Sequence, residues 1–218
     1  MKEHHLPVQR TARYFTLGEI TDALQEIWFV CHGYGQLARY FLRNFDPIAD
    51  KSRLIVAPEA LSRFYLQSTN GRIGATWMTR ENRENEIADY LAYLNNLSEA
   101  IFEKIPRQSV RIILLGFSQG VATISRWHHH GQVNADRLIL WAGLIPPEID
   151  LQISGEKFRQ TDLHLVLGDA EPYAQPEIIR EHRSRLADGD VKFTAHSFAG
   201  GHIIDGKTLQ KIAGTPIP

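Results

Sequence analysis

The stretch RIILLGFSQGVATISRW, residues 111–127, decides the fold. It begins with a run of branched aliphatic side chains, which is typical of a buried β-strand, and continues with apolar side chains at every third position, which is typical of a helix with one packed face. Ser118 stands at the junction, between Gly116 and Gly120. Glycine weakens both strands and helices, so two glycines at this place indicate a constraint on the backbone.

A Gly-x-Ser-x-Gly sequence between a strand and a helix is the pattern of a nucleophile elbow. The turn is so sharp that a Cβ at either glycine would crowd it. In a parallel α/β sheet, sites lie at the carboxyl ends of the strands, where the serine hydroxyl would stand out at the positive end of the helix. The stretch therefore predicts that Ser118 is a nucleophile.

The rest of the chain alternates between short apolar runs and helical patterns. Five runs are continuously apolar, as in parallel strands covered on both faces; they span residues 26–33, 53–60, 110–117, 137–143 and 162–169. Residues 12–20 and 191–198 alternate more, which suits strands nearer an edge. Helical spacing follows residue 84 and Pro176. We therefore predict an α/β fold, with a mostly parallel central sheet and helices on both faces.

Composition limits the classes of function. The 218 residues fit one domain, 1–218, with 43% hydrophobic and 22% charged residues. A net charge of −1 gives no electrostatic footprint for nucleic acid, and no apolar stretch is long enough for a transmembrane helix. The first ten residues, MKEHHLPVQR, show no signal peptide, and Cys31 has no second cysteine with which to form a disulfide. These features favour the cytoplasm and leave the oligomeric state open.

A serine nucleophile needs a base and an orienting acid, which follow it on this fold in the order serine, acid, histidine. His202 comes after FAGG, in the loop between the last predicted strand and the final helix, and is the predicted base. The other downstream histidines suit this role less well. The three at residues 128–130 are expected at a solvated helix end. His164 and His196 are expected within strands, and His182 within a helix. The acid is Asp169 or Glu171, since both follow the strand at residues 162–168.

Two further features point to a site for a small molecule. An oxyanion hole needs backbone N–H groups, and the candidates are Gln119, directly after the serine, and Tyr34, in the glycine-rich HGYGQ loop. The connection at residues 61–82 has no sustained period, and long aperiodic connections in compact domains are usually functional. We expect its Trp77 and Met78 to line an apolar substrate pocket; the alternative is a surface loop whose aromatic rings pack onto the body.

In combination, these motifs resemble the phospholipase/carboxylesterase family of α/β-hydrolases, which includes bacterial carboxylesterases and acyl-protein thioesterases. HGYGQ is similar to its oxyanion loop, GFSQG to its elbow, GDAEPY to its acid loop and GGH to its histidine loop. The resemblance extends over residues 13–212. It implies that Ser118 is the nucleophile and His202 the base, with Tyr34 and Gln119 as backbone donors.

For the acid, the resemblance favours one of the two candidates. The family usually places an aspartate three residues after the glycine that ends the strand, and counting from Gly168 gives Glu171. A glutamate here departs from the family pattern, as does Val121 after the elbow, where many members have another glycine. These departures indicate a divergent branch of the family.

The sequence thus predicts a serine hydrolase that cleaves carboxylic esters, with thioesters and lysophospholipids as further substrate candidates. It would act through an acyl-enzyme on Ser118 and need no metal or organic cofactor. The expected partner is a small-molecule ester, with neither nucleic acid nor integral membrane association. Two alternatives remain open: a non-catalytic binding protein that retains the fold, and a dienelactone-type hydrolase.

Overall fold

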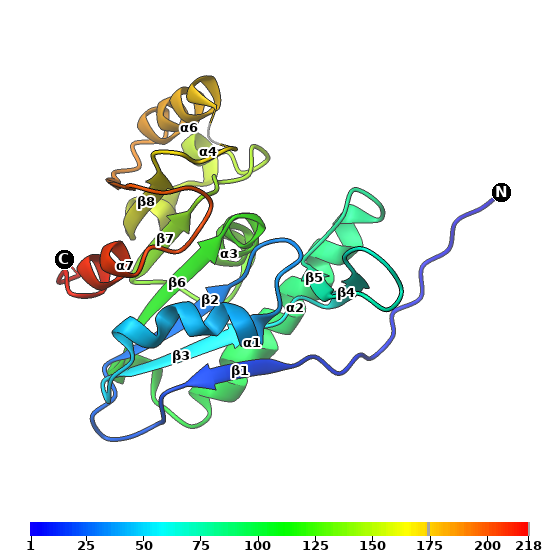
Figure 1. The fold of residues 1–218 in the computed structure, drawn as a ribbon, viewed down its shortest axis with the longest axis horizontal. Coiled ribbons are helices and arrows are strands. Elements are labelled where there is room, and N and C mark those ends of the chain that lie inside the picture. The colour runs from blue at the N-terminus through cyan, green and yellow to red at the C-terminus, as the bar shows by residue number, and fades with distance from the viewer. Residues whose placement is uncertain (174, 218) are drawn as a thin grey trace.

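A seven-stranded sheet organises the structure, a computed structural model that describes residues 1–173 and 175–217 (Figure 1). The strands run in the order β1-β3-β2-β6-β7-β8-β9. Their bounds are β1 (Tyr14–Leu17), β2 (Glu26–Cys31), β3 (Arg53–Pro58), β6 (Arg111–Phe117), β7 (Arg137–Trp141), β8 (Asp162–Gly168) and β9 (Thr194–Phe198). All neighbours are parallel except β1 and β3. The predicted mostly parallel sheet is confirmed, and the two runs with alternating patterns are its edge strands.

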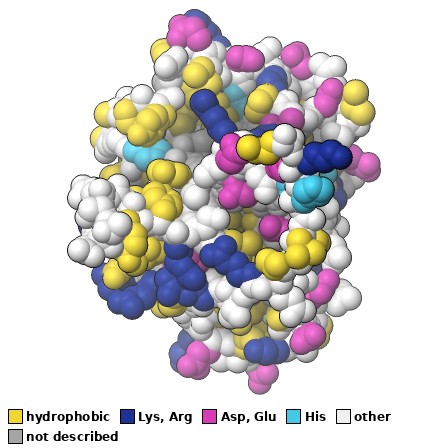
Figure 2. Space-filling model, turned by 90° about the vertical axis from the view of Figure 1, so that its right-hand side faces the viewer, with side chains coloured by type: hydrophobic (Ala, Val, Ile, Leu, Met, Phe, Trp, Pro, Cys, Tyr) yellow, Lys and Arg dark blue, Asp and Glu magenta, His cyan; other side chains and the backbone are white. Residues whose placement is uncertain are grey.

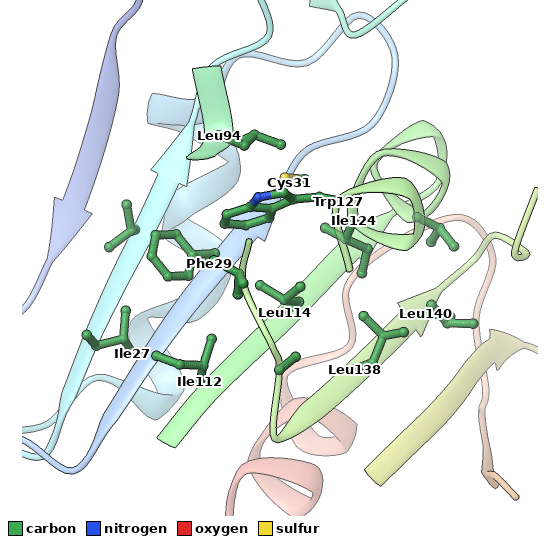
Figure 3. Close-up of a cluster of buried hydrophobic side chains, with 14 of the residues drawn as sticks. Ile27, Phe29, Cys31, Leu94, Ile112, Leu114, Ile124, Trp127, Leu138 and Leu140 are labelled. Carbon is green, nitrogen blue, oxygen red and sulfur yellow. The ribbon is translucent and has the colours of Figure 1, made fainter. Parts of the chain in front are cut away.

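Helices and two distinct cores cover the two faces of this sheet. The helical segments are α1 (Ala38–Phe41), η1 (Leu42–Ile48), α2 (Arg83–Phe102), η2 (Arg107–Ser109), α3 (Gln119–His130), α4 (Leu151–Ser154), α5 (Glu156–Arg159), α6 (Pro176–Asp188) and α7 (Gly206–Ala213). One core joins the sheet to α2, α3 and α6, and the other joins it to η1 and α7. Figure 3 shows the part of the first core that lies between the sheet, α2 and α3. Phe29 belongs to the first core and Trp28 to the second, because successive strand residues point to opposite faces.

The connection at residues 61–82 is more ordered than its sequence indicates. It contains a second, two-stranded sheet formed by β4 (Ser62–Tyr65) and β5 (Ile73–Thr76), which pair antiparallel. Each strand has only four residues, too few to show a period in the sequence. This hairpin packs against the loop that follows β2, where Gly35 N–H donates to Ala75 O (2.9 Å).

The surface mixes side chains of every kind. On the face shown in Figure 2, hydrophobic side chains lie in several groups among charged side chains of both signs, so no one type covers the whole face. In the described part of the chain, no helix combines the length and apolar character needed to cross a membrane.

The first histidine at the end of α3 is buried, contrary to expectation. We expected a solvated helix end, but His128 is 1% exposed, and its ring lies 5.0 Å from that of Phe158. Its Nε2 is 3.1 Å from Thr161 Oγ1 on the segment before β8. The prediction was wrong for His128 because α5 covers this end of α3, a contact that local sequence does not reveal. Burial lowers the pKa of His128 to about 4.

Three buried histidines make stability depend on pH. Burial also lowers the pKa of His32 and of His182 to about 4, whereas the pKa of histidine in an unfolded chain is about 6.5. Between these values the unfolded state binds more protons, so the free energy of unfolding should fall as the pH is lowered from about 6.5 towards about 4. Urea unfolding at pH 7, 6 and 5 measures this slope.

A matched pair of variants tests the cause of this slope. His182→Gln should reduce the slope by about one proton, since it removes one buried titrating group. The exposed His4→Gln should leave the slope unchanged. A free energy of unfolding that stays constant from pH 6.5 to pH 5 would contradict the prediction.

Candidate active site

Ser118 lies in the turn between β6 and α3 with an unusual backbone conformation. Its φ of 55° and ψ of −117° fall in a region that L-residues rarely adopt, at a cost of about 1–3 kcal/mol. The Ser118 N–H donates to Trp141 O on the neighbouring strand β7 (2.8 Å). The surrounding structure therefore holds the strained turn in place, as expected of a nucleophile elbow.

The two glycines of this turn leave no room for a side chain. A Cβ at Gly116 would overlap the Gly120 carbonyl, and a Cβ at Gly120 would overlap the Cys31 carbonyl at the end of β2. Helix α3 therefore starts in direct contact with the backbone of the two central strands. This close approach explains why both positions flanking Ser118 by two residues are glycine.

His202 pairs with Glu171. His202 Nδ1 lies 2.8 Å from Glu171 Oε1, and the Glu171 side chain is only 2% exposed. Asp169 does something else: its Oδ1 accepts from Gly200 N–H (2.9 Å). This hydrogen bond and the one from Ala170 N–H to Gly200 O (2.9 Å) join the loop after β8, which carries Asp169 and Glu171, to the loop that carries His202.

β7 holds the histidine loop close to the elbow. The imidazole of His202 lies 4.7 Å from the ring of Phe117, the residue directly before Ser118. The indole N–H of Trp141 donates to Ile203 O (2.8 Å), while the Trp141 carbonyl accepts from Ser118 N–H. One residue of β7 thus contacts both the serine turn and the histidine loop.

The two predicted backbone donors have no partner within the described residues. No hydrogen bond there involves the N–H of Tyr34 or of Gln119. Both groups therefore remain available to an external acceptor. Gln119 is the first residue of α3, where the positive end of the helix dipole adds to the attraction for negative charge.

His32, which the sequence interpretation did not single out, fixes the loop that bears Tyr34. Its ring is fully buried; Nε2 accepts from Ala60 N–H (3.1 Å), so the proton is on Nδ1, which donates to Gly33 O (2.8 Å). Gly33 C=O and Tyr34 N–H belong to one planar peptide group. The bond from His32 therefore sets the direction of the Tyr34 N–H. The position of His32, at the end of a strand and directly before the glycine loop, was the available sequence signal.

Trp77 and Met78 contact the two segments that carry the predicted backbone donors. The Trp77 indole N–H donates to His32 O (2.8 Å), and the ring is only 2% exposed, so it offers almost no surface to a substrate. The Gln119 side chain accepts from Trp77 N–H (3.1 Å) and donates to Met78 O (2.8 Å). The Met78 sulfur lies 3.7 Å from the guanidinium of Arg126. The burial of Trp77 fits the alternative of an aromatic ring packed onto the body, because the hairpin turns this side chain inward. Met78 is only half-buried, and its place in a substrate pocket stays a prediction.

The described residues contain no group of three or more His, Cys, Asp or Glu side chains that could hold a metal ion.

A mostly parallel sheet, a strained serine turn after its central strand and a histidine loop after its last strand define an α/β-hydrolase. The sequence profile of the phospholipase/carboxylesterase family matches residues 19–214, and the chain belongs to this family. It is therefore a hydrolase of the esterase and thioesterase type.

Several solved structures share the fold at low sequence identity. Zea mays acyl-protein thioesterase 2 is 16% identical, with a TM-score of 0.71 over 93% of this chain and 96% of that one. The Bacillus cereus carboxylesterase is 14% identical, with a TM-score of 0.66 over 93% and 92%. A phospholipase/carboxylesterase from Dyadobacter fermentans is 18% identical, with a TM-score of 0.63 over 96% and 98%. The search of curated protein sequences finds no match.

Proposed function

We propose that the chain hydrolyses carboxylic esters through an acyl-enzyme on Ser118, with His202 as base and Glu171 as acid. The observation that carries this proposal is the 2.8 Å contact between His202 Nδ1 and the buried Glu171 carboxylate, beside the strained Ser118 turn. A histidine paired with a buried carboxylate at the same edge of the sheet as a strained serine is the arrangement that activates a hydroxyl nucleophile.

The first half of the reaction forms the acyl-enzyme. Ser118 Oγ attacks the ester carbonyl carbon while its proton passes to His202 Nε2. Glu171 Oε1 accepts from Nδ1–H and stabilises the imidazolium that results. The carbonyl oxygen becomes an oxyanion, for which Tyr34 and Gln119 supply N–H donors. The intermediate then collapses: the bond to the leaving oxygen breaks, and His202 returns its proton to the leaving alcohol.

The second half releases the acid. Water attacks the acyl carbon and gives a proton to His202. The bond to Ser118 Oγ breaks, and the serine takes that proton back. A thioester would follow the same steps with a thiol as leaving group. Thioesters are the second substrate class to examine, because one structure that shares this fold is named as an acyl-protein thioesterase.

Hydrolysis of p-nitrophenyl esters with acetyl, butyryl and longer acyl groups tests the proposal, together with an S-butyryl thioester. We expect turnover of at least one ester and covalent labelling by a fluorophosphonate. A protein that binds esters without turnover and is not labelled would fit the non-catalytic alternative and contradict the proposal.

His32 should act as a positioning residue for the oxyanion hole. His32→Ala frees the peptide group that carries the Tyr34 N–H, and loss of one such donor costs about 10²–10³ in kcat. We expect a decrease in kcat of about 10²-fold with little change in KM, since His32 does not touch the substrate. Steady-state kinetics on p-nitrophenyl butyrate measures both constants.

Two variants separate this role from a general loss of stability. His32→Asn can place its amide nitrogen where Nδ1 lies and still donate to Gly33 O, although it does not reach Ala60 N–H, so it should restore part of the kcat. His182→Ala, at another buried histidine, should lower the melting temperature without a selective decrease in kcat. If folded His32→Ala keeps the wild-type kcat, His32 does not position the donor.

A further inference from the structure

Two large apolar side chains lie exposed beside the histidine loop. Tyr173 is 72% exposed and Ile203, the residue after His202, is 54% exposed. The Tyr173 ring centroid lies 5.0 Å from that of the imidazole, with the planes inclined by 75°. The ring of Tyr173 thus packs beside the imidazole, and Ile203 follows His202 directly in the chain; we call these two side chains the apolar rim.

This exposure is not the result of a loosely held backbone. The Tyr173 N–H donates to Glu171 Oε1 (3.3 Å), and the Tyr173 carbonyl accepts from Gln175 N–H (3.1 Å). The Ile203 N–H donates to Gly201 O (2.9 Å), and its carbonyl accepts from the Trp141 indole (2.8 Å). Both side chains therefore point into solvent from backbones held by hydrogen bonds on each side.

The proposed mechanism indicates which part of the substrate lies next to this rim. His202 protonates the leaving group, so the leaving atom must come within about 3 Å of Nε2. The first atoms attached to the leaving oxygen then lie within reach of the rings that flank the imidazole. The acyl oxygen, in contrast, is directed towards the N–H groups of Tyr34 and Gln119. The rim beside His202 therefore faces the alcohol part of an ester, not its carbonyl oxygen.

We propose that Tyr173 and Ile203 form the leaving-group subsite and select an aromatic or bulky apolar alcohol or thiol. This inference rests on the proposed function. Tyr173 offers a flat ring with most of its surface uncovered, and an aryl leaving group would cover it edge-to-face or offset-stacked. The phenolic hydroxyl is not required for this contact.

Three butyrate esters test the subsite: benzyl, cyclohexylmethyl and ethyl. All three release an alkyl alcohol from the same acyl group, so they differ mainly in the size and aromaticity of the leaving group. For Tyr173→Ala we expect kcat/KM to fall about tenfold for the benzyl ester, less for the cyclohexylmethyl ester and under about twofold for the ethyl ester. Tyr173→Phe should keep the wild-type preference.

Tyr14→Ala is the matched control. Tyr14 is 41% exposed and lies on β1, the edge strand at the other end of the sheet from β8 and β9. This variant should leave all three rates unchanged.

The outcomes separate a subsite from a purely positioning role. An equal loss on all three esters would mean that Tyr173 only orients His202 and Glu171, and it would overturn the proposal. Unchanged rates in Tyr173→Ala, or a wild-type enzyme that turns over the ethyl ester but not the benzyl ester, would also overturn it. Each of these results leaves the proposed function intact, provided that the hydrolysis observed is lost in Ser118→Ala. A wild-type protein that hydrolyses none of the esters tested and resists fluorophosphonate labelling refutes both the subsite and the proposed function.

Discussion

Ser118→Ala should abolish ester hydrolysis and fluorophosphonate labelling. The alanine has no group to attack the carbonyl, and removal of the nucleophile from such a triad costs about 10⁶-fold in kcat. The fold should survive, because Ser118 is held through its backbone N–H and not through its hydroxyl. Labelling is followed by mass spectrometry and hydrolysis by p-nitrophenyl butyrate, with far-UV circular dichroism as the check on folding.

Two further variants accompany this test. Ser184→Ala, at an exposed serine on α6, should keep wild-type activity and labelling. Ser118→Gly should also be inactive, but it should melt at a higher temperature than Ser118→Ala, because glycine adopts a φ of 55° without strain. A fully labelled Ser118→Ala protein would remove the nucleophile assignment and, with it, the proposed mechanism.

The second large effect is expected at the acid. Glu171→Gln keeps the shape of the side chain but removes the charge that stabilises the imidazolium, and the amide analogue in a comparable triad lowers kcat by up to about 10⁴. One oxygen of Glu171 is also buried without a hydrogen-bond partner among the described residues. The amide nitrogen of the glutamine could occupy that position only without an acceptor, so the melting temperature should change as well, though far less than the rate.

Asp169→Asn is the matched comparison two residues away. Its amide oxygen can still accept from Gly200 N–H, so we expect near-normal kcat and a small loss of stability. The comparison to make is the kcat of Glu171→Gln against the kcat of Asp169→Asn, measured on the same ester. Activity that collapses only in Asp169→Asn would move the acid to Asp169 and leave the roles of Ser118 and His202 standing.

The sheet could be predicted from the sequence because each main strand is marked by the hydrophobic pattern of its own consecutive residues. Continuous apolar runs mark strands covered on both faces, and the alternating runs near each end of the chain became the edge strands β1 and β9. The elbow was equally readable, since the strand, the two glycines and the helix lie within seventeen consecutive residues. Four-residue elements such as β4, β5 and α5 carry no period long enough to detect.

Contacts between distant segments explain what the sequence did not reveal. The burial of His128 depends on Thr161 and Phe158, about thirty residues away. The role of His32 depends on Ala60, and the inward turn of Trp77 depends on bonds to His32 and Gln119. The position after β8 left both Asp169 and Glu171 as candidates for the acid, and only the spacing of the resembled family favoured Glu171. Their side chains differ in direction, and only the folded backbone shows this.

Trp141 has a consequence for how the site tolerates thermal motion. Its carbonyl holds the Ser118 turn and its indole holds the loop of His202, so the two loops share one anchor on β7. We expect a displacement of β7 to move both loops together, since each is tied to the same residue by a hydrogen bond. The separation between the proposed nucleophile and the proposed base should then change less than the position of either loop.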